Sequence, residues 1–239
     1  MTQAQLEAER CGMIPEDNPT EFFSKHLSAY HFLKKYASNK SILEVGFGDG
    51  YGMNYLSENA KEIIGIDIAP KNIPLAETKY PNSKLSFIHF DGYHFPFEGC
   101  RFDIVCTFQV IEHIPEEKLI EWLTEIKRVL KPGGIFCVST LNLKNAQKPG
   151  GTYQKNKDHE KEFFAWELQD LLRQVFEQTE HFGLFYSFRH RLFKRLKKWG
   201  LLRLGFVRNH FLSVSVNDFV VRSNFLDDSI DLFAICHKL

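Results

Sequence analysis

The sequence contains an apolar run that opens into a glycine-rich loop, and this feature limits the fold more than any other. The segment reads Ile42-Leu43-Glu44-Val45-Gly46-Phe47-Gly48-Asp49-Gly50-Tyr51-Gly52. An apolar run of this length predicts a buried strand, and glycines on alternate positions allow a tight turn that a ligand can approach closely. The dinucleotide-binding pattern requires a third glycine where Tyr51 stands. The loop therefore predicts a nucleoside ligand of another kind.

Further carboxylates follow at the ends of the next two apolar runs. Asp67 comes twenty-one residues after Gly46, at the end of the second run, and Asp91-Gly92 ends the third. A carboxylate at the tip of a second strand can accept hydrogen bonds from both hydroxyls of a ribose. This arrangement favours a cofactor that contains adenosine.

Apolar runs alternate with helical stretches along the chain. Five predicted strands lie near 41–46, 62–67, 85–90, 102–108 and 134–140, and two more lie near 179–186 and 231–236. Strand–helix–strand units of this kind are right-handed and bind ligands at the carboxyl ends of the strands. The predicted fold is α/β: a Rossmann-like, doubly wound, mostly parallel seven-stranded sheet with helices on both faces.

The clearest predicted helix spans 116–130, directly after Pro115, which is a good helix opener. Its apolar positions form one stripe at helical spacing. The stripe consists of Leu119, Ile120, Leu123, Ile126 and Leu130.

The order of these signals resembles the class I S-adenosylmethionine-dependent methyltransferases over roughly residues 20–180. The matching parts are the glycine loop, the strand-end Asp67, the Asp91-Gly92 turn, the Ile111-Glu112-His113 segment and the Lys-Pro-Gly-Gly turn at 131–134. Five signals in this order, about one strand and one helix apart, are specific. The pattern is most similar to the bacterial branch that includes quinone-biosynthesis and sugar or lipid methyltransferases.

The resemblance implies that the cofactor is S-adenosyl-L-methionine and that the glycine loop binds it. Glu44 would face the amino acid end of the cofactor, directly or through water. Gly46, Gly48 and Gly50 would admit that end of the molecule.

The resemblance also assigns the nucleoside end of the cofactor. Asp67 would hold the ribose, and Asp91 would hold the adenine amino group. Ile68 and Gly92 would border the adenine ring, and Gln109 would lie near the methionine moiety. The alternative for Asp67 is an ordinary strand-end acid, and the alternative for Asp91 is a turn residue.

A helix over about 18–37 is predicted upstream of the glycine loop, with Asn18 as its N-cap and Pro19 at its first position. In the resembled family this helix packs beside the cofactor loop. His26 and Tyr30 are therefore candidates for the substrate pocket, and plain packing is the alternative for both.

Two histidines are the catalytic candidates. His113 would accept a proton from a hydroxyl acceptor, since the ordinary pKa of histidine suits a base at neutral pH. His159 stands shortly before a predicted helix, where the resembled family often has a histidine, and we expect it to shape the acceptor pocket. Glu112 is a pocket candidate, or a residue that packs beneath the site. No histidine pair has a metal-ligand spacing, so no metal site is predicted.

Composition excludes several classes of function. Basic and acidic residues number 30 each, so the chain as a whole does not attract nucleic acid, and no Asn-Pro-Pro-Tyr type of base-amine motif follows the fourth strand. The first twenty residues lack an apolar core, and no run approaches about 18 apolar residues. The five cysteines lack Cys-x-x-Cys spacing and are expected to be reduced. We expect a cytoplasmic protein.

We expect the 239 residues to form a single methyltransferase domain over 1–239. Its parts are a helix at about 18–37, a cofactor-binding core at about 41–145, a lid and helix at about 146–176, and C-terminal strands with a basic insertion at about 187–226.

The basic insertion is the part that the resemblance explains least. Residues 188–208 hold eight cations and no acidic residue: Arg189, Arg191, Lys194, Arg195, Lys197, Lys198, Arg203 and Arg208. Phe185, Phe188, Leu192, Leu196 and Trp199 recur at helical spacing. One interpretation is a cap that packs its apolar face on the domain. A second is a segment that meets an anionic acceptor, or the anionic membrane that carries it, which would place the protein peripherally at the inner membrane face. A third is a segment that binds nucleic acid.

These observations favour an S-adenosylmethionine-dependent methyltransferase that acts on oxygen of a small molecule, or of a glycan or lipid-linked precursor. One alternative is methylation of carbon or nitrogen, including a quinone-type ring. Another is a nucleoside-binding protein with the same fold and no turnover.

Overall fold

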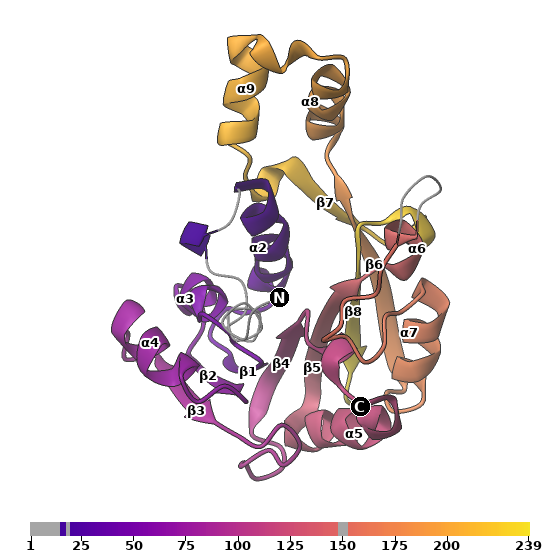
Figure 1. The fold of residues 1–239 in the computed structure, drawn as a ribbon. Coiled ribbons are helices and arrows are strands. Elements are labelled where there is room, and N and C mark those ends of the chain that lie inside the picture. The colour runs from indigo at the N-terminus through magenta and orange to yellow at the C-terminus, as the bar shows by residue number, and fades with distance from the viewer. Residues whose placement is uncertain (1–14, 18–19, 148–152) are drawn as a thin grey trace.

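The computed structural model describes residues 15–17, 20–147 and 153–239, and these residues build one eight-stranded sheet with the order β3-β2-β1-β4-β5-β8-β6-β7 (Figure 1). The strands are β1 (Ser41–Val45), β2 (Glu62–Asp67), β3 (Leu85–His89), β4 (Phe102–Phe108), β5 (Leu130–Leu141), β6 (Gln178–Tyr186), β7 (Phe219–Arg222) and β8 (Asp231–His237). The predicted α/β fold is confirmed.

The first five strands are parallel, and β8 lies antiparallel between β5 and β6. The sheet has one strand more than predicted, because the insertion ends in β7, which pairs with the edge of β6. β5 also begins earlier than predicted, since Leu130 already pairs with Phe102 before the turn at Gly133, where φ is +75°. The register shift between Phe102 and Ile104 accommodates that turn.

Helices cover both faces of the sheet (Figure 1). The α-helices are α2 (Thr20–Lys34), α3 (Tyr51–Ser57), α4 (Asn72–Lys79), α5 (Leu119–Val129), α6 (Leu143–Ala146), α7 (Ala165–Arg173), α8 (Phe188–Lys198) and α9 (Gly205–Leu212). Short 3-10 turns are η1 (Pro15–Asp17), η2 (Ile111–His113), η3 (Glu116–Lys118), η4 (Leu201–Arg203), η5 (Val216–Asp218) and η6 (Leu226–Asp228). One apolar core contains side chains of α2, α3 and α4, and a second contains those of α5 and α7. The parallel strands are therefore buried from both sides.

Helix boundaries follow the sequence signals with some differences. The N-terminal helix is described from Thr20, so the predicted cap at Asn18 and Pro19 lies outside the described residues, as does the 148–152 part of the predicted lid. The predicted helix 116–130 begins as η3 and continues as α5. Ile120 does not belong to its buried stripe, because its side chain is 40% exposed, whereas Ile126 is fully buried.

The insertion forms a helical hairpin of α8, η4 and α9 that projects away from the sheet beyond β7 (Figure 1). The prediction that Phe185 belongs to the apolar face of this helix is wrong, because Phe185 lies in β6 and pairs with Val220. Among the described residues, no helix is long and apolar enough to cross a bilayer.

We expect Ile126→Ala to lower the free energy of unfolding by about 2 to 5 kcal/mol, because it leaves a cavity in the core beneath the sheet. The matched control is Ile120→Ala on the same helix, which should change stability by less than about 1 kcal/mol. Urea denaturation measures both. Equal losses for the two variants would contradict the placement of Ile126 in the core.

Candidate functional site

The glycine loop after β1 has a backbone that only glycine adopts easily. Gly46, Gly48 and Gly50 have φ values of +77°, +57° and +90°. A Cβ atom on Gly46 would lie 2.6 Å from Cγ2 of Val110, so this position is also sterically closed to any other residue. The predicted tight turn is confirmed, and it brings the backbone to the carboxyl ends of the strands.

The fourth glycine of the motif has a different task. A Cβ atom on Gly52 would lie 1.9 Å from the ring of Tyr30, so Gly52 makes room for that ring to pack across α3. The Tyr30 hydroxyl then donates a hydrogen bond to Oε1 of Glu44 at 2.6 Å. Tyr30, predicted as a pocket residue, is buried and acts on Glu44.

Glu44 is a buried carboxylate in the middle of the site. Only 1% of the residue is exposed, and its Oε2 has no hydrogen-bond partner among the described residues. Burial raises the pKa of Glu44 to about 8. A buried carboxylate oxygen without a donor is costly, so this atom is a natural acceptor for a cationic donor from a ligand.

Asp67 ties the second strand to the glycine loop. Its Oδ2 accepts the N–H of Gly48 at 2.9 Å, and its Oδ1 accepts the N–H of Ala69 at 2.8 Å. Burial raises the pKa of Asp67 above its ordinary value, and these amide hydrogen bonds oppose the rise. Each oxygen keeps a further lone pair, so the carboxylate can still accept two hydroxyl donors.

The predicted adenine-binding residues lie together at the tips of β2 and β3. A Cβ atom on Gly92 would lie 3.3 Å from Cγ2 of Ile68, and Ile68 is 60% exposed despite its apolar side chain. Asp91 is engaged in its own turn. Its Oδ1 accepts the amides of Tyr93 and His94, and its Oδ2 pairs with Nδ1 of His94 at 2.7 Å. These bonds, first that to the amide of His94, lower the pKa of Asp91, and sequence reasoning missed His94.

Gln109 stands at the tip of β4 in a left-handed conformation with φ of +59°. Its N–H donates to the carbonyl of Ser139 at 2.9 Å, which fixes the turn into η2. Such a conformation is costly for a residue other than glycine, and strain of this kind is concentrated at functional sites.

Glu112 is fully buried beneath the site. Its Oε2 accepts the Thr140 hydroxyl at 2.9 Å, and burial raises the pKa of Glu112 to about 7. Its carbonyl oxygen accepts the amides of Glu160 and Lys161. The main chain of Glu112 therefore attaches the 158–161 segment to η2, while its buried side chain contacts Thr140.

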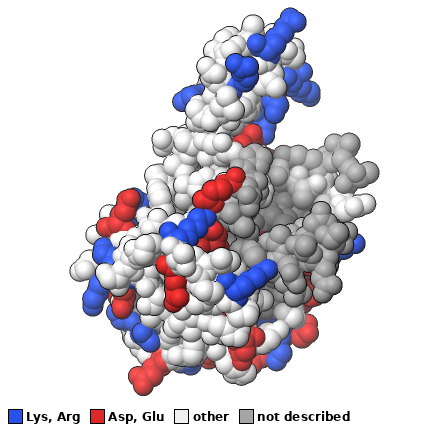
Figure 2. Space-filling model, turned by 60° about the vertical axis from the view of Figure 1, so that its left-hand side comes forward, with Lys and Arg blue, Asp and Glu red and all other residues white. Residues whose placement is uncertain are grey.

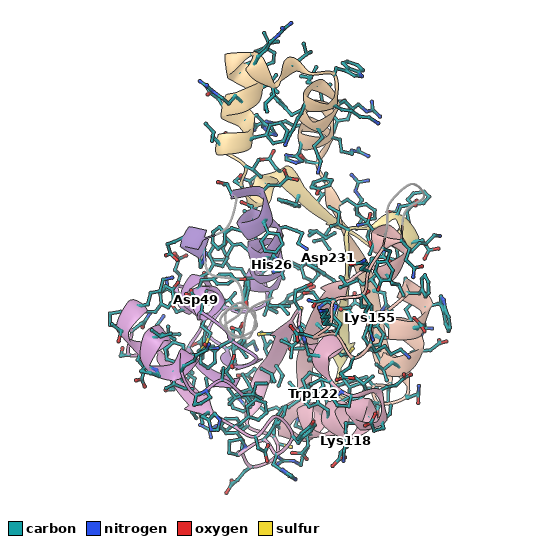
Figure 3. All side chains as sticks on the ribbon, viewed as in Figure 1. His26, Asp49, Lys118, Trp122, Lys155 and Asp231 are labelled. Carbon is teal, nitrogen blue, oxygen red and sulfur yellow. The ribbon has the colours of Figure 1, made fainter. Side chains whose placement is uncertain are left out.

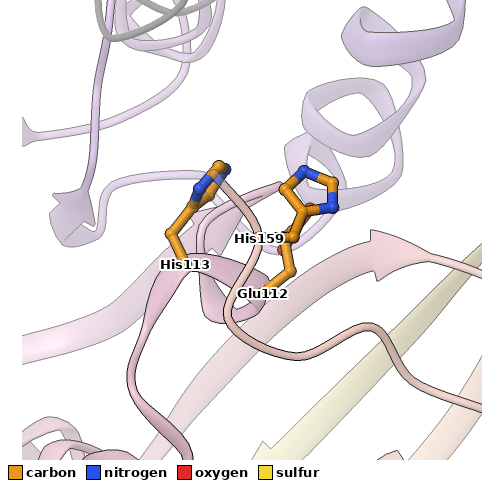
Figure 4. Close-up of side chains that lie close together, drawn as sticks. All are labelled: Glu112, His113 and His159. Carbon is orange, nitrogen blue, oxygen red and sulfur yellow. The ribbon is translucent and has the colours of Figure 1, made fainter. Parts of the chain in front are cut away.

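His113 and His159 come from distant parts of the chain and lie side by side (Figure 4). Their ring centroids are 4.8 Å apart, nearly perpendicular. Nδ1 of His113 lies 2.8 Å from the carbonyl oxygen of Asp158, which can only accept, so Nδ1 carries the proton and Nε2 is left as an acceptor. Partial desolvation of the ring lowers the pKa of His113 below 6.5, so the ring is neutral near pH 7.

His159 is held by a carboxylate. Its Nδ1 lies 2.6 Å from Oε1 of Glu162, and the hydroxyl of Tyr153 donates to the other oxygen of the same carboxylate. Sequence reasoning missed Tyr153 and Glu162. The sequence signal for this contact is that Glu162 follows His159 by three residues. A loop, as well as a helix, can bring two side chains at this spacing together.

A partly buried ion pair links α2 to the last strand. Lys25 lies 3.3 Å from Asp231, and burial raises the pKa of Asp231. Asp231 and His26 are labelled in Figure 3. His26, the neighbouring pocket candidate, has a buried Nε2 without a partner among the described residues. Burial, followed by the charge of Lys25, lowers the pKa of His26 to about 3, so the ring stays neutral.

Two groups of described side chains have ligand atoms close enough to share a cation, although the sequence spacing predicted no metal site. Glu112, His113 and His159 form one group, and His190, His210 and Asp218 form the other, each with ligand atoms within 4.8 Å of one another. Spacing rules do not detect either group, because each group combines residues from distant parts of the chain. In the first group, Thr140 and Asp158 already engage one atom each of Glu112 and His113.

Comparison with known proteins agrees with this geometry. Residues 43–138 match the family described as "Methyltransferase domain". A probable S-adenosylmethionine-dependent methyltransferase of Mycolicibacterium smegmatis is 32% identical over 167 residues, which cover 70% of this chain and 63% of that protein. A ubiquinone biosynthesis O-methyltransferase of Cereibacter sphaeroides is 34% identical over 103 residues, covering 42% and 41% of the two chains. The chain thus spans less than two thirds of the length of these relatives.

A solved structure shares the fold. The S-adenosylmethionine-dependent methyltransferase of Thermotoga maritima, described as a possible histamine N-methyltransferase, has a TM-score of 0.62 at 18% identity and covers 90% of this chain and 89% of its own. The fold and the glycine loop define a Rossmann-like nucleoside-binding protein of the methyltransferase class. Residues 43–138 belong to the methyltransferase domain family, and the chain is a relative of the class I S-adenosylmethionine-dependent methyltransferases.

The described residues fit the cofactor of this family. Glu44 offers an unpaired acceptor to an amino group, the glycine loop excludes Cβ atoms, and Asp67 keeps free lone pairs for the ribose hydroxyls. The assignments of Ile68, Asp91, Gly92 and Gln109 to the cofactor stay predictions. Asp91 would have to share its oxygens with the turn that it caps.

The raised pKa of Glu44 gives the unliganded protein a pH-dependent stability. The folded value of about 8 lies above the ordinary 4.5, so the folded chain binds an extra proton and loses stability as the pH rises from 4.5 to about 8. Glu44→Gln has no ionisable group and keeps an acceptor for Tyr30. The Tm of the variant minus the Tm of the wild type should therefore increase as the pH is raised from about 5 to about 8. Thermal unfolding at the two pH values measures this difference.

The control for this experiment is Glu77→Gln, which removes an exposed carboxylate on α4. Its Tm difference from the wild type should be the same at both pH values. A constant difference for Glu44→Gln as well would contradict the buried, protonated state of Glu44.

Proposed function

We propose that the chain is an S-adenosylmethionine-dependent methyltransferase that methylates oxygen of a small molecule, or of a glycan or lipid-linked precursor. The observation that supports oxygen as the acceptor atom is the His113 ring, whose tautomer leaves Nε2 ready to take a hydroxyl proton. The name of the ubiquinone O-methyltransferase relative agrees with this choice.

The chain's own residues have four tasks in the proposed reaction. Glu44 and Asp67 bind the two ends of the cofactor, and the apolar side chain of Ile68 excludes water from the adenine side. S-adenosylmethionine, held by these residues, would supply an electrophilic methyl group. Nε2 of His113 takes the proton of the acceptor hydroxyl, and His159 positions the acceptor against His113.

Methylation of carbon or nitrogen is the alternative within this class, and binding without turnover is the alternative outside it. Release of S-adenosylhomocysteine in the presence of a hydroxylated acceptor, compared with the same acceptor carrying a methyl ether in place of the hydroxyl, distinguishes these cases. Turnover with the hydroxyl compound alone supports O-methylation. Equal turnover with both would contradict it.

Asp67→Ala should weaken the binding of S-adenosylmethionine by about 1.5 to 3 kcal/mol, because it removes charged acceptors from the ribose hydroxyls. Isothermal titration calorimetry measures the affinity, and the Tm without ligand reports any loss of the Gly48 contact. The control is Asp170→Ala, which removes an exposed aspartate on α7 and should leave affinity unchanged. Unchanged affinity for Asp67→Ala, or a preference for a nicotinamide dinucleotide, would refute the cofactor site.

His113→Ala should lower kcat by about 10² to 10⁴-fold with little change in cofactor affinity. Because the pKa of His113 lies below 6.5 and the neutral ring is the active form, wild-type kcat should fall as the pH decreases into that range. His237→Ala, on the distant end of β8, is the matched control. An unchanged rate together with a lower Tm would show that His113 is structural.

A further inference from the structure

The hairpin formed by residues 187–217, here called the basic hairpin, carries charges of one sign only. It holds eight cations and no acidic residue. Figure 2 shows basic side chains over the projecting lobe and acidic ones at its base. Of the eight cations, only Lys194 forms an ion pair within the described part of the chain, at 2.9 Å from Glu21.

The outward side of α8 is apolar as well as cationic. Phe188, Leu192 and the C-cap residue Trp199 are 75%, 43% and 70% exposed, and their spacing places them on one stripe of the helix. Arg191 and Arg195, both exposed, border that stripe. The interpretation in which the apolar face packs on the domain is therefore wrong for these residues.

These outward side chains are not needed for the packing of the hairpin. Its interior is made by other residues: Nδ1 of His190 lies 3.0 Å from Nε2 of His210, and the ring of Phe193 stacks on His210 with centroids 3.9 Å apart. Val207 on α9 is fully buried. The hairpin thus has a core of its own and presents a second set of side chains to the outside.

The second helix of the hairpin, α9, also carries exposed apolar side chains. Exposed apolar residues continue through η4 and α9, where the largest exposed fractions are 59% for Phe206 and 70% for Leu212. A groove beside α8 is lined by Glu21, Lys194, Arg195, Lys197, Lys198 and Phe211. Cations next to an accessible groove can receive phosphate groups, while the apolar side chains beside them favour a hydrocarbon environment.

We infer that the basic hairpin docks on the surface of an anionic phospholipid bilayer. Phe188, Leu192 and Trp199 enter the headgroup region, and the arginines and lysines beside them bind lipid phosphates. This inference rests on the hairpin alone and does not depend on the identity of the methyl acceptor.

The charge of the rest of the chain supports this orientation. Since basic and acidic residues are equal in number overall and the hairpin is purely basic, the remaining residues carry an excess of acidic groups. An anionic surface repels that body and attracts the hairpin, so the molecule approaches the bilayer hairpin first. Nucleic acid would satisfy the cations but would leave exposed aliphatic side chains of the hairpin, such as Leu192 and Leu212, without a partner.

The test is co-sedimentation of the full chain with vesicles of phosphatidylcholine alone and of phosphatidylcholine with phosphatidylglycerol, at low and physiological salt. We expect binding to the anionic vesicles at both salt concentrations, weaker at the higher one, and little binding to the neutral vesicles. Equal binding to both kinds of vesicle, or to neither, would overturn the proposal.

Two variants separate the contributions. Replacing Arg191, Arg195 and Lys198 together by Gln should weaken binding on the order of a hundredfold. The pair Phe188→Ser and Trp199→Ser should weaken it at physiological salt, where screening leaves the apolar contribution dominant. The matched control replaces three exposed lysines of the body, Lys35, Lys40 and Lys61, by Gln and should not weaken binding.

Tryptophan fluorescence gives an independent readout. In a Trp166→Phe background, which removes the other exposed tryptophan, emission of Trp199 should shift to shorter wavelength with anionic vesicles. No shift, or binding that short duplex DNA abolishes while vesicles are not retained, would refute the bilayer as the partner. A dimer in light scattering that the Phe188→Ser and Trp199→Ser pair dissociates would show that a second copy covers the stripe.

Unchanged calorimetric affinity for S-adenosylmethionine in these variants would show that the chain is folded. Loss of vesicle binding with intact cofactor binding therefore tests the hairpin, and loss of cofactor binding in Asp67→Ala tests the proposed function.

Discussion

The hydrogen bond from Tyr30 to Glu44 connects the elements on which the site depends. It joins α2 to β1 in a buried position, and it can form only because Gly52 leaves space for the Tyr30 ring. Oε2 of Glu44 already lacks a donor in this buried position. Loss of the Tyr30 hydrogen bond would leave Oε1 without a donor as well, which would cost further free energy, so the bond favours this arrangement of α2 and β1. The helix before the glycine loop, the strand beneath it and the helix after it are therefore positioned together.

Buried acids accumulate at the carboxyl ends of the strands. Burial raises the pKa of Glu44, Glu112 and Asp231, and Lys25 neutralises Asp231 directly. Each of these groups makes the unliganded fold less stable near neutral pH than an apolar residue would. A loss of stability at buried polar groups is a common accompaniment of a binding site.

The parts predicted best from the sequence depend on local physical rules. Apolar runs predicted the strand positions, and the conformational freedom of glycine predicted the turn at Gly46. The structure confirms both. Contacts between distant residues could not be predicted in this way. Glu162 against His159, Lys25 against Asp231 and His94 against Asp91 depend on tertiary placement or on a turn geometry that spacing does not specify. The additional strand, β7, was not predicted because it has only four residues and follows a long helical insertion.

The 158–161 segment is attached to η2 through main-chain atoms of the segment. The carbonyl of Glu112 accepts two amides of the segment, and the carbonyl of Asp158 receives the His113 ring. Hydrogen bonds to the backbone do not depend on which side chains the segment carries. Sequence changes within the segment can therefore accumulate in evolution while its position beside η2 is retained.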